Sequence, residues 1–512
     1  CILLQQKDGK FIRKNLLPGI KNYPAISKDE GILIFDANGD GKPDIYISSG
    51  GYGLSPGNNN YQDRLFINDG KGNFRMDTTA IPVNHNSKFC VRAFDYNRDG
   101  KLDLFISSRV DPWNYPRPVS CFIYRNDSKN GHAKFTDVTD EVAPGLKNIG
   151  MVCDALFSDF DGDGQTDLIV VGEWMPVSFF KNTNGKFKDV TGASGISGKR
   201  GWWNSIVAGD FRNTGRMDYI VGNLGLNSLY QASDSFPVYM TAKDFENNGK
   251  YAGIPSLFLP DQQGVKREFP AQGRDDITRQ LNSLKKRFNN YKKYAVATMD
   301  DLLTPEQRSG ALRLEANMLQ SCYLRNDGNG KFTMIPLPIE AQFSSVNGML
   351  VDDFDGDGNL DVLINGNDYS TSVGIGQYDA FYGLLLKGDG AGGFKPLSML
   401  QTGICIPGNG KALVKLTGTT DKYLVAASQR NGRLELFELN KSQRTFRIDA
   451  MDRFALLKLT NGKIQKQELN NGSSFLSQSA SFLSVGSLVT TIQITNSQGA
   501  VRNIYMDDQK EK

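Results

Sequence analysis

A short acidic pattern recurs along the 512-residue chain, and an apolar run follows each copy. Its clearest copy is residues 159–167, Asp-Phe-Asp-Gly-Asp-Gly-Gln-Thr-Asp, which is followed by Leu168-Ile169-Val170-Val171. Acidic residues at positions 1, 3, 5 and 9, with glycine at position 6, describe a loop that wraps one hard cation, and the carbonyl of position 7 can supply another oxygen. Because no helical pattern flanks the loop, the sequence predicts that it joins two β-strands.

Four copies keep this pattern, and for each of them we predict one bound Ca²⁺ ion. Carboxylate, amide and backbone carbonyl oxygens are the ligands that calcium prefers. Polar hairpin turns without a metal are the alternative interpretation. The predicted ligands are Asp36, Asn38, Asp40, Lys42 and Asp44 in the first loop, Asp95, Asn97, Asp99, Lys101 and Asp103 in the second, Asp159, Asp161, Asp163, Gln165 and Asp167 in the third, and Asp353, Asp355, Asp357, Asn359 and Asp361 in the fourth.

Two further copies of the pattern are incomplete. The loop that begins at Asp210 carries Arg212 where a carboxylate is expected, and the loop that begins at Asp244 ends on Ala252. For both loops we favour turns without metal. Because two carboxylates without a cation would repel each other, we predict that the Arg212 guanidinium lies within hydrogen-bonding distance of Asp210 or Asp218.

An aromatic-rich hairpin follows the acidic loops, for example residues 64–74 with their Asp69-Gly70 turn. One unit is therefore strand, acidic loop, strand, long loop, strand, tight turn and strand, which is the four-stranded antiparallel sheet of a propeller blade. We predict an all-β fold, a seven-bladed β-propeller with a helical insertion and a small C-terminal β domain. The seven units begin at Asp36, Asp95, Asp159, Asp210, Asp244 and Asp353, and the last, without an acidic loop, covers residues 412–437.

The repeats suggest where the domains begin and end. The predicted propeller covers residues 24–446, and residues 1–23 have the pattern of a partial repeat hairpin that closes the ring or belongs to an upstream blade. Apolar residues spaced from Ile277 to Phe288 form one face of a helix. This spacing places a helical insertion at about 269–317, between the second and third strands of the fifth unit. Residues 447–512 predict a small β domain.

Composition narrows the classes of protein and partner. The formal net charge is +3, and the basic residues do not form the patch or stripe that is typical of nucleic-acid binding. No apolar run is long enough to span a bilayer. The six cysteines lack metal-ligand spacing and predict buried free thiols. The sequence shows no signal peptide and resembles part of a repeat from its start, so we expect the C-terminal part of a longer precursor. A lipid-bearing Cys1 is the alternative, and it would be the only attachment to a membrane.

The acidic units resemble the FG-GAP or VCBS-type repeats of integrin-α-like propellers. The segment LTNGKIQKQELNNGSSFLSQSASFLSVG resembles the ASPIC/UnbV domain that follows such repeats in proteins related to cartilage acidic protein. GEWMPVSFFKN and WWNSIVAGDF resemble bacterial members of that group, which are common in Bacteroidota. The resemblance implies calcium binding and a place on the extracellular face of the cell, at the outer-membrane surface, where such lipoproteins occur near TonB-dependent glycan importers.

Function is expected on the loops opposite the acidic ones, where aromatic residues stand beside amides and carboxylates. Such surfaces suit sugars or proteins. We predict a non-catalytic binding scaffold for a glycan or protein partner. The alternative is a polysaccharide lyase or glycosidase that uses Glu173, Asp368 and Asp379, although the two histidines, His85 and His132, lie elsewhere in the sequence. The predicted contact residues are Trp113, Tyr115, Trp174 and Tyr369.

Overall fold

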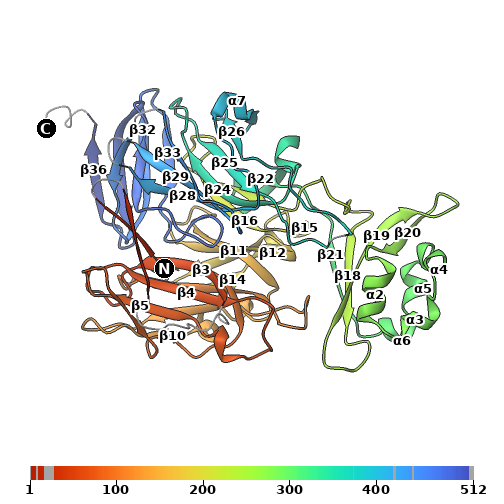
Figure 1. Cartoon of the computed structure of the whole chain (residues 1–512). Helices are drawn as coiled ribbons and strands as arrows, with labels where there is room; N and C mark the ends of the chain where they lie inside the picture. The colour runs from red at the N-terminus through yellow and green to blue at the C-terminus, as the bar shows by residue number, and fades with distance from the viewer. Residues whose placement is uncertain are drawn as a thin grey trace.

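The computed structural model describes residues 2–6, 10–16, 28–372, 374–418, 422–440 and 443–506, and most of its elements are β-strands in antiparallel sheets (Figure 1). Six sheets follow one another along the chain and are called sheets 1 to 6. Sheet 1 contains β3 (Lys28–Phe35), β4 (Asp44–Gly50), β5 (Arg64–Asn68) and β6 (Phe74–Asp77), and sheet 2 contains β7 (Ser87–Phe94), β8 (Asp103–Val110), β9 (Phe122–Asn126) and β10 (Phe135–Asp137). Sheet 3 contains β11 (Met151–Ser158), β12 (Asp167–Pro176), β13 (Ser178–Thr183) and β14 (Lys186–Asp189), and sheet 4 contains β16 (Ser205–Gly209), β17 (Asp218–Gly222), β22 (Cys322–Gly328) and β23 (Lys331–Pro336). Sheet 5 contains β24 (Val346–Asp352), β25 (Asp361–Gly366), β26 (Leu384–Gly388) and β27 (Phe394–Leu397), and sheet 6 contains β28 (Gly410–Thr417), β29 (Tyr423–Gln429) and β30 (Glu435–Glu438).

The sheets share one topology. Within each of them neighbouring strands are antiparallel and paired in chain order, and in sheets 1 to 5 an acidic loop joins the first two strands. The first strand of each sheet contacts the first strand of the next, from β3 through β7, β11, β16 and β24 to β28. This succession of sheets around their first strands makes the fold propeller-like.

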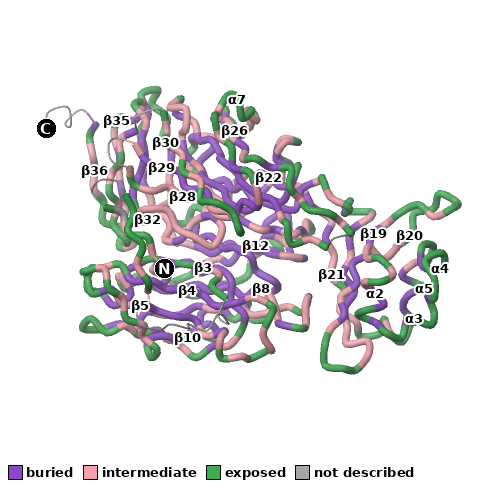
Figure 2. The backbone as a smooth tube through the Cα atoms, in the orientation of Figure 1, coloured by how far each residue is buried: buried purple, intermediate pink, exposed green. Residues whose placement is uncertain are grey.

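Packing between neighbouring sheets explains why the strands are apolar on both faces. Leu168 to Val171 of β12 are completely buried, as expected for a strand that is covered on both sides. Phe179 of sheet 3 stacks on Phe332 of sheet 4 with 4.5 Å between ring centroids. Buried residues accordingly follow the strands, and exposed residues follow the connections (Figure 2).

The pairing in sheet 4 differs from the predicted units. The loop that begins at Asp210 joins β16 to β17, but the sheet is completed by β22 and β23, about a hundred residues later in the chain. The loop that begins at Asp244 lies in a separate sheet, between β18 (Val238–Lys243) and β19 (Ala252–Pro260). The predicted fourth and fifth units are therefore one sheet and its insertion, and the described residues form six successive sheets where seven units were predicted.

The insertion covers residues 223–321, between the second and third strands of sheet 4. It projects from the side of the sheets (Figure 1) and contains a four-stranded sheet together with short helices, which lie within the predicted helical range. Ile277, Leu281, Leu284 and Phe288 are buried in its core, as their helical spacing requires. Besides β18 and β19, its elements are β20 (Lys266–Pro270), β21 (Leu312–Ala316), α2 (Arg274–Gln280), α3 (Leu284–Arg287), α4 (Tyr291–Ala295), α5 (Met299–Leu302) and α6 (Pro305–Arg308).

After sheet 6 the chain forms a two-stranded sheet, β31–β34, and a four-stranded sheet in the order β33-β32-β35-β36. The segment of residues 470–481, between β33 and β34, returns to the six sheets, where it bonds to β3, β7 and β28. The bounds are β31 (Arg444–Arg447), β32 (Asp452–Leu459), β33 (Ile464–Glu468), β34 (Phe482–Val485), β35 (Val489–Asn496) and β36 (Val501–Tyr505).

The remaining elements are small. A hairpin of β1 (Ile2–Gln5) and β2 (Phe11–Lys14) lies near sheet 1, where Ile2 packs against Phe66 and its neighbours; Cys1 and residues 17–23 of the predicted partial repeat lie outside the described residues. No helix in the described ranges is long and apolar enough to cross a membrane. β15 (Arg200–Trp202) pairs with β12 as a fifth strand of sheet 3. The connections contain α1 (Thr139–Val142), α7 (Met399–Thr402), and the short helices Asn59–Tyr61, Pro144–Leu146, Thr191–Ala193 and Ile339–Gln342.

The cysteines only partly follow the prediction of buried free thiols. Cys90, Cys121, Cys153 and Cys322 are free and buried, and burial raises the pKa of Cys90 to about 11. Cys405 is free but exposed, because it lies in the irregular connection before sheet 6 rather than in a strand.

Candidate functional site

The acidic loops wrap their first carboxylate in backbone N–H groups. Asp353 Oδ1 accepts from the N–H of Gly356 at 2.7 Å, and its Oδ2 accepts from the N–H of Gly358 at 2.9 Å. Gly358 stands at position 6 with φ +85°, a left-handed conformation that favours glycine. The loop that begins at Asp36 has the same arrangement around Gly41, with φ +81°. The pattern therefore fixes the turn itself before any ion is considered.

The last aspartate of each complete loop is buried and ties the loop to the third strand of its sheet. Asp44 Oδ1 accepts from the N–H of Asn68 at 2.8 Å, and Asp361 Oδ1 accepts from the N–H of Gly388 at 2.9 Å. Burial, with neighbouring carboxylates adding to it, raises the pKa of Asp361 to about 7 and those of Asp103 and Asp167 to about 8. A nearby cation would favour the charged form of these carboxyl groups.

Two loops bring three carboxylates together. Within the described ranges these groups are Asp159, Asp161 and Asp167, and Asp353, Asp355 and Asp361, whose ligand oxygens lie within 4.8 Å of one another. Asp167 Oδ2 is also buried without a hydrogen-bond partner. This donor set is compatible with calcium, which prefers oxygen ligands. The loops that begin at Asp36 and Asp95 carry an asparagine at position 3, so one of their predicted ligands is an amide and they do not form the same carboxylate triad.

Lysines from the third strands lie against the carboxylates at positions 3 and 5 of the two loops that contain the triads. Lys181 forms ion pairs with Asp161 and with Asp163, the latter at 2.9 Å, and Lys387 pairs in the same way with Asp355 and with Asp357. Each lysine therefore neutralises part of the negative charge of a complete loop.

The incomplete loop of sheet 4 contains an arginine in place of a third acidic side chain. Arg212 donates from Nε to Asp218 Oδ2 at 2.9 Å and from Nη2 to Asp218 Oδ1 at 2.8 Å. The predicted contact is therefore confirmed for Asp218. Asp210, the first aspartate of the same loop, accepts hydrogen bonds from the N–H groups of Thr214 and Gly215 instead.

Replacing Arg212 by Asp is expected to create an additional calcium site and to destabilise the calcium-free protein. The variant loop would carry carboxylates at positions 1, 3 and 9, whereas the completely buried Asp218 would lose its charged partner, at a cost of about 1–3 kcal/mol. Calorimetric titration with calcium should then count one more ion per chain than in the wild type. The matched control is Arg216→Asp, which makes the same change of charge on the exposed side of the loop. An unchanged number of bound calcium ions in Arg212→Asp would refute the interpretation.

A cavity of about 1750 Å³ opens at the other end of the strands. The acidic loops precede β4, β8 and β12, whereas the cavity is lined by residues at or beyond the far ends of these strands, Gly51, Arg109 and Glu173. Side chains of the insertion and of the segment 470–481 complete the lining. The cavity and the acidic loops therefore lie at opposite ends of the sheets.

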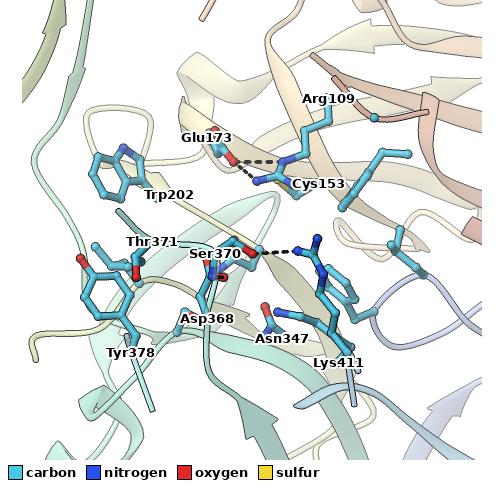
Figure 3. Close-up of a pocket in the computed structure, with 18 of the residues that line it drawn as sticks. Arg109, Cys153, Glu173, Trp202, Asn347, Asp368, Ser370, Thr371, Tyr378 and Lys411 are labelled. Carbon is cyan, nitrogen blue, oxygen red and sulfur yellow. Dashed lines mark hydrogen bonds and ion pairs between the residues drawn. The ribbon is translucent and has the colours of Figure 1, made fainter. Parts of the chain in front are cut away.

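A hydrogen-bonded chain runs along the cavity wall, and Figure 3 shows its first link, between Arg109 and Glu173. Arg109 donates from Nε to Glu173 Oε1 at 3.0 Å, and Glu173 Oε2 accepts from the hydroxyl of Tyr115 at 2.9 Å. The same hydroxyl accepts from Trp174 Nε1 at 2.9 Å. Glu173 raises the pKa of Arg109, so this guanidinium stays charged at neutral pH. Trp174 has φ +62°, which is uncommon for a residue other than glycine.

Aromatic rings form another part of the cavity wall. Trp202 lies edge-on to Trp174 at 4.7 Å and to Tyr230 at 4.8 Å, measured between ring centroids. Tyr378 lines the cavity nearby and bonds through its backbone to Asp368. Edge-to-face contacts of this kind fix the orientation of the rings.

The four predicted contact residues have different positions. Tyr115 and Trp174 line the cavity, and Trp174 is buried. Trp113 is 37% exposed outside the lining, where Lys250 Nζ lies 4.8 Å from its ring centroid. Tyr369 is 37% exposed and is not part of the lining, although its neighbour Asp368 is.

Sequence reasoning missed several lining residues. Trp202, Lys411 and Arg430 line the cavity but come from β15, from β28 and from the connection after β29, and only the paired tryptophans at 202 and 203 stand out in the sequence. Of the carboxylates considered for an enzyme, Glu173 and Asp368 line the cavity and Asp379 does not.

Comparison with known proteins gives one family match. Residues 36–106 and 159–221 match the family model of the FG-GAP-like repeat, and no curated protein matches the chain. Similar solved structures include the rhamnogalacturonan lyase YesW (10% identity, TM-score 0.29, 90% of this chain and 74% of that one), the exotype rhamnogalacturonan lyase YesX (11%, 0.24, 98% and 74%) and the Bacillus licheniformis rhamnogalacturonan lyase PL11 (10%, 0.21, 94% and 71%). These TM-scores are too low to support an argument about this chain. The two matched regions contain the acidic loops of sheets 1 to 4, so the chain contains FG-GAP-like repeats.

Proposed function

We propose that the chain is a calcium-stabilised propeller scaffold that binds an extracellular glycan or protein in the cavity opposite the acidic loops. The observation that carries the proposal is the cavity itself, whose lining comes from or adjoins all six sheets and the insertion. Small-molecule sites commonly occupy about 300–1,000 Å³, so a cavity of about 1750 Å³ leaves room for an extended ligand.

The scaffold would hold its binding side chains in place before the ligand arrives. Tyr115 and Trp174 are fixed by hydrogen bonds, and Trp202 is fixed between two rings. Side chains that are already ordered lose little entropy on binding. Four calcium ions, at the loops that begin at Asp36, Asp95, Asp159 and Asp353, would hold the turns at the other end of the sheets.

The calcium loops also support a location outside the cytoplasm. Extracellular calcium modules bind with Kd on the order of 10⁻⁴ to 10⁻³ M, which suits calcium concentrations outside cells. We propose the outer-membrane surface of a bacterium, with a lipid anchor as the membrane attachment and outer-membrane transporter components as possible partners. The sheet β33-β32-β35-β36 would then correspond to the ASPIC/UnbV-like domain.

Replacing Trp202 by Ala is expected to weaken ligand binding by about tenfold or more, because a buried aromatic contact is worth more than 1 kcal/mol at binding hot spots. Binding to immobilised glycans and cell-surface proteins, in the presence of calcium, is the measurement. Trp113→Ala is the matched control, since Trp113 lies outside the lining. Normal binding by Trp202→Ala, together with loss of binding when the exposed lysines of the insertion are changed, would place the site elsewhere. These lysines are Lys285, Lys286, Lys292 and Lys293.

A polysaccharide lyase or glycosidase is the second candidate, and one observation favours it. Burial lowers the pKa of Lys411 to about 8 and raises that of Glu30, and both residues line the cavity. A lysine that titrates near pH 8 can serve acid–base chemistry. New reducing ends or unsaturated sugars after incubation with a bound polysaccharide would identify an enzyme, whereas retention of the intact polymer would identify a binding protein.

A further inference from the structure

Two cations in the cavity, Lys411 and Arg430, have no carboxylate at ion-pair distance in the described part of the chain, although the Glu30 carboxyl also lines the cavity and interacts electrostatically with Arg430. Lys411 Nζ donates to the carbonyl of Asn367 at 3.1 Å, and Arg430 Nη1 donates to Ser370 Oγ at 2.7 Å. Among the described residues neither forms an ion pair, in contrast to Arg109, whose charge is matched by Glu173. Both side chains therefore keep N–H groups that can bind an anion.

The surroundings of Lys411 disfavour the charged form of its own ammonium group. Burial lowers its pKa to about 8; Asp368 opposes this effect, while Arg430 and Arg109 lower the pKa further. Asp368 already accepts a hydrogen bond from the N–H of Ser370 at 2.8 Å. An anion from outside would relieve the repulsion between the lysine and the two guanidinium groups.

Two aromatic side chains of the cavity, Trp202 and Tyr378, lie apart from its cations, whereas Phe89 and Phe475 lie against Arg109 and Lys411. In Figure 3, Trp202 and Tyr378 lie on one side, and Arg109 and Lys411 on the other. The hydroxyl and amide groups of Ser345, Asn347 and Ser428 also line the cavity. Aromatic faces and polar groups together suit sugar rings, and clustered cations suit a carboxylate.

We propose that the cavity binds an acidic oligosaccharide, with a uronate carboxylate between Lys411 and Arg430 and neighbouring sugar rings against Trp202 and Tyr378. This inference rests on the proposed binding function and specifies the ligand class. A guanidinium can hold a carboxylate with two parallel hydrogen bonds, and an ammonium adds a point charge. A saccharide is favoured over an acidic peptide because each sugar ring has an apolar face for Trp202 or Tyr378 and hydroxyl groups for the polar side chains of Ser345, Asn347 and Ser428.

Calorimetry with uronate oligosaccharides and with their carboxyl-reduced counterparts tests the proposal on the calcium-loaded full chain. The pair differs only in the carboxylate, so the wild type should bind the acidic sugar about ten- to a hundredfold more tightly. Lys411→Met and Arg430→Gln should each remove most of this preference without changing the binding of the reduced sugar. Lys422→Met is the matched control, because Lys422 pairs with Glu438 on the same sheet and does not line the cavity.

The outcomes separate this inference from the proposed function. Equal binding of both sugars, lost in Trp202→Ala but kept in Lys411→Met, would overturn the acidic ligand and leave the binding scaffold intact. Binding of an acidic peptide without binding of any saccharide would overturn the ligand class in favour of a protein. Circular dichroism and calcium titration of each variant confirm that a loss of binding does not reflect unfolding.

The preference for the acidic sugar should also depend on pH. Free Lys411 loses its charge as the pH rises through about 8, while a bound carboxylate raises its pKa. Affinity for the acidic sugar should therefore fall between about pH 7 and pH 9, by up to about tenfold per unit above 8. The same titration in Lys411→Met should be flat, and a parallel fall in that variant would assign the effect to another group.

Discussion

Replacing Arg92 by Met is expected to lower the free energy of unfolding by about 3–5 kcal/mol, because it leaves a buried carboxylate without its partner. The side chains of Arg92 and Asp154 are 3% and 1% exposed and form an ion pair. Arg92 also donates to the carbonyls of Ala155 at 3.0 Å and Ser474 at 2.7 Å. Asp154 accepts from the N–H of Ile206 at 3.1 Å. The pair thus joins sheets 2, 3 and 4 to the segment 470–481.

Urea unfolding followed by tryptophan fluorescence measures this loss. Arg75→Met is the control, since the Arg75 side chain is 73% exposed and pairs only loosely with Asp77. The double variant Arg92→Met with Asp154→Leu should recover part of the stability, because replacing both partners of a buried ion pair by apolar groups is often nearly neutral. Equal stability of Arg92→Met and Arg75→Met would contradict the assigned role.

Chelation of calcium is expected to lower the free energy of unfolding by about 6 kcal/mol in total. At calcium concentrations about ten times Kd, each site contributes about 1.4 kcal/mol by mass action, and four sites are proposed. The buried aspartates that end the loops would then lose a favourable neighbouring charge. Calorimetric scans with and without EGTA should show a markedly lower unfolding temperature after chelation.

Elemental analysis separates the proposed four sites from the two carboxylate triads. Four ions per chain would support calcium at the loops with Asn38 and Asn97, and two ions would restrict it to the triads. Asp353→Asn should remove one ion and its share of the stability, whereas Asp327→Asn, in the hairpin of sheet 4, should remove none. An unfolding temperature that EGTA does not change would refute calcium stabilisation.

The sequence predicted what depends on local pattern. Nine residues are enough to define an acidic loop, so the strand–loop–strand units could be located. The opposite charge of Arg212 was enough to predict a contact with Asp210 or Asp218, and the structure shows it with Asp218. The pairing of β17 with β22 could not be predicted in this way, because about a hundred residues separate them. The insertion also begins with a strand and a degenerate acidic loop, which imitates a separate unit.

The cavity depends on the same long-range pairing. Trp202, Lys411 and Arg430 come together only because sheets 3 and 6 lie around one centre. Loop composition alone identified Tyr115 and Trp174 but could not distinguish them from Trp113, whose side chain lies outside the cavity. A charged residue near the end of a strand, such as Arg109 in β8, gives no sign of which neighbouring strand it will face.

The segment 470–481 affects the order in which the protein can fold. The N–H of Ile34 in β3 donates to the side chain of Gln478, 444 positions later, and the N–H of Ile32 donates to the carbonyl of Leu476. Contacts of such sequence separation form late, and domains of a nascent chain fold as they emerge during synthesis. The inner edge of β3 therefore stays unpaired on the ribosome until residues 476–478 have been made, and during that time it can pair with another nascent chain.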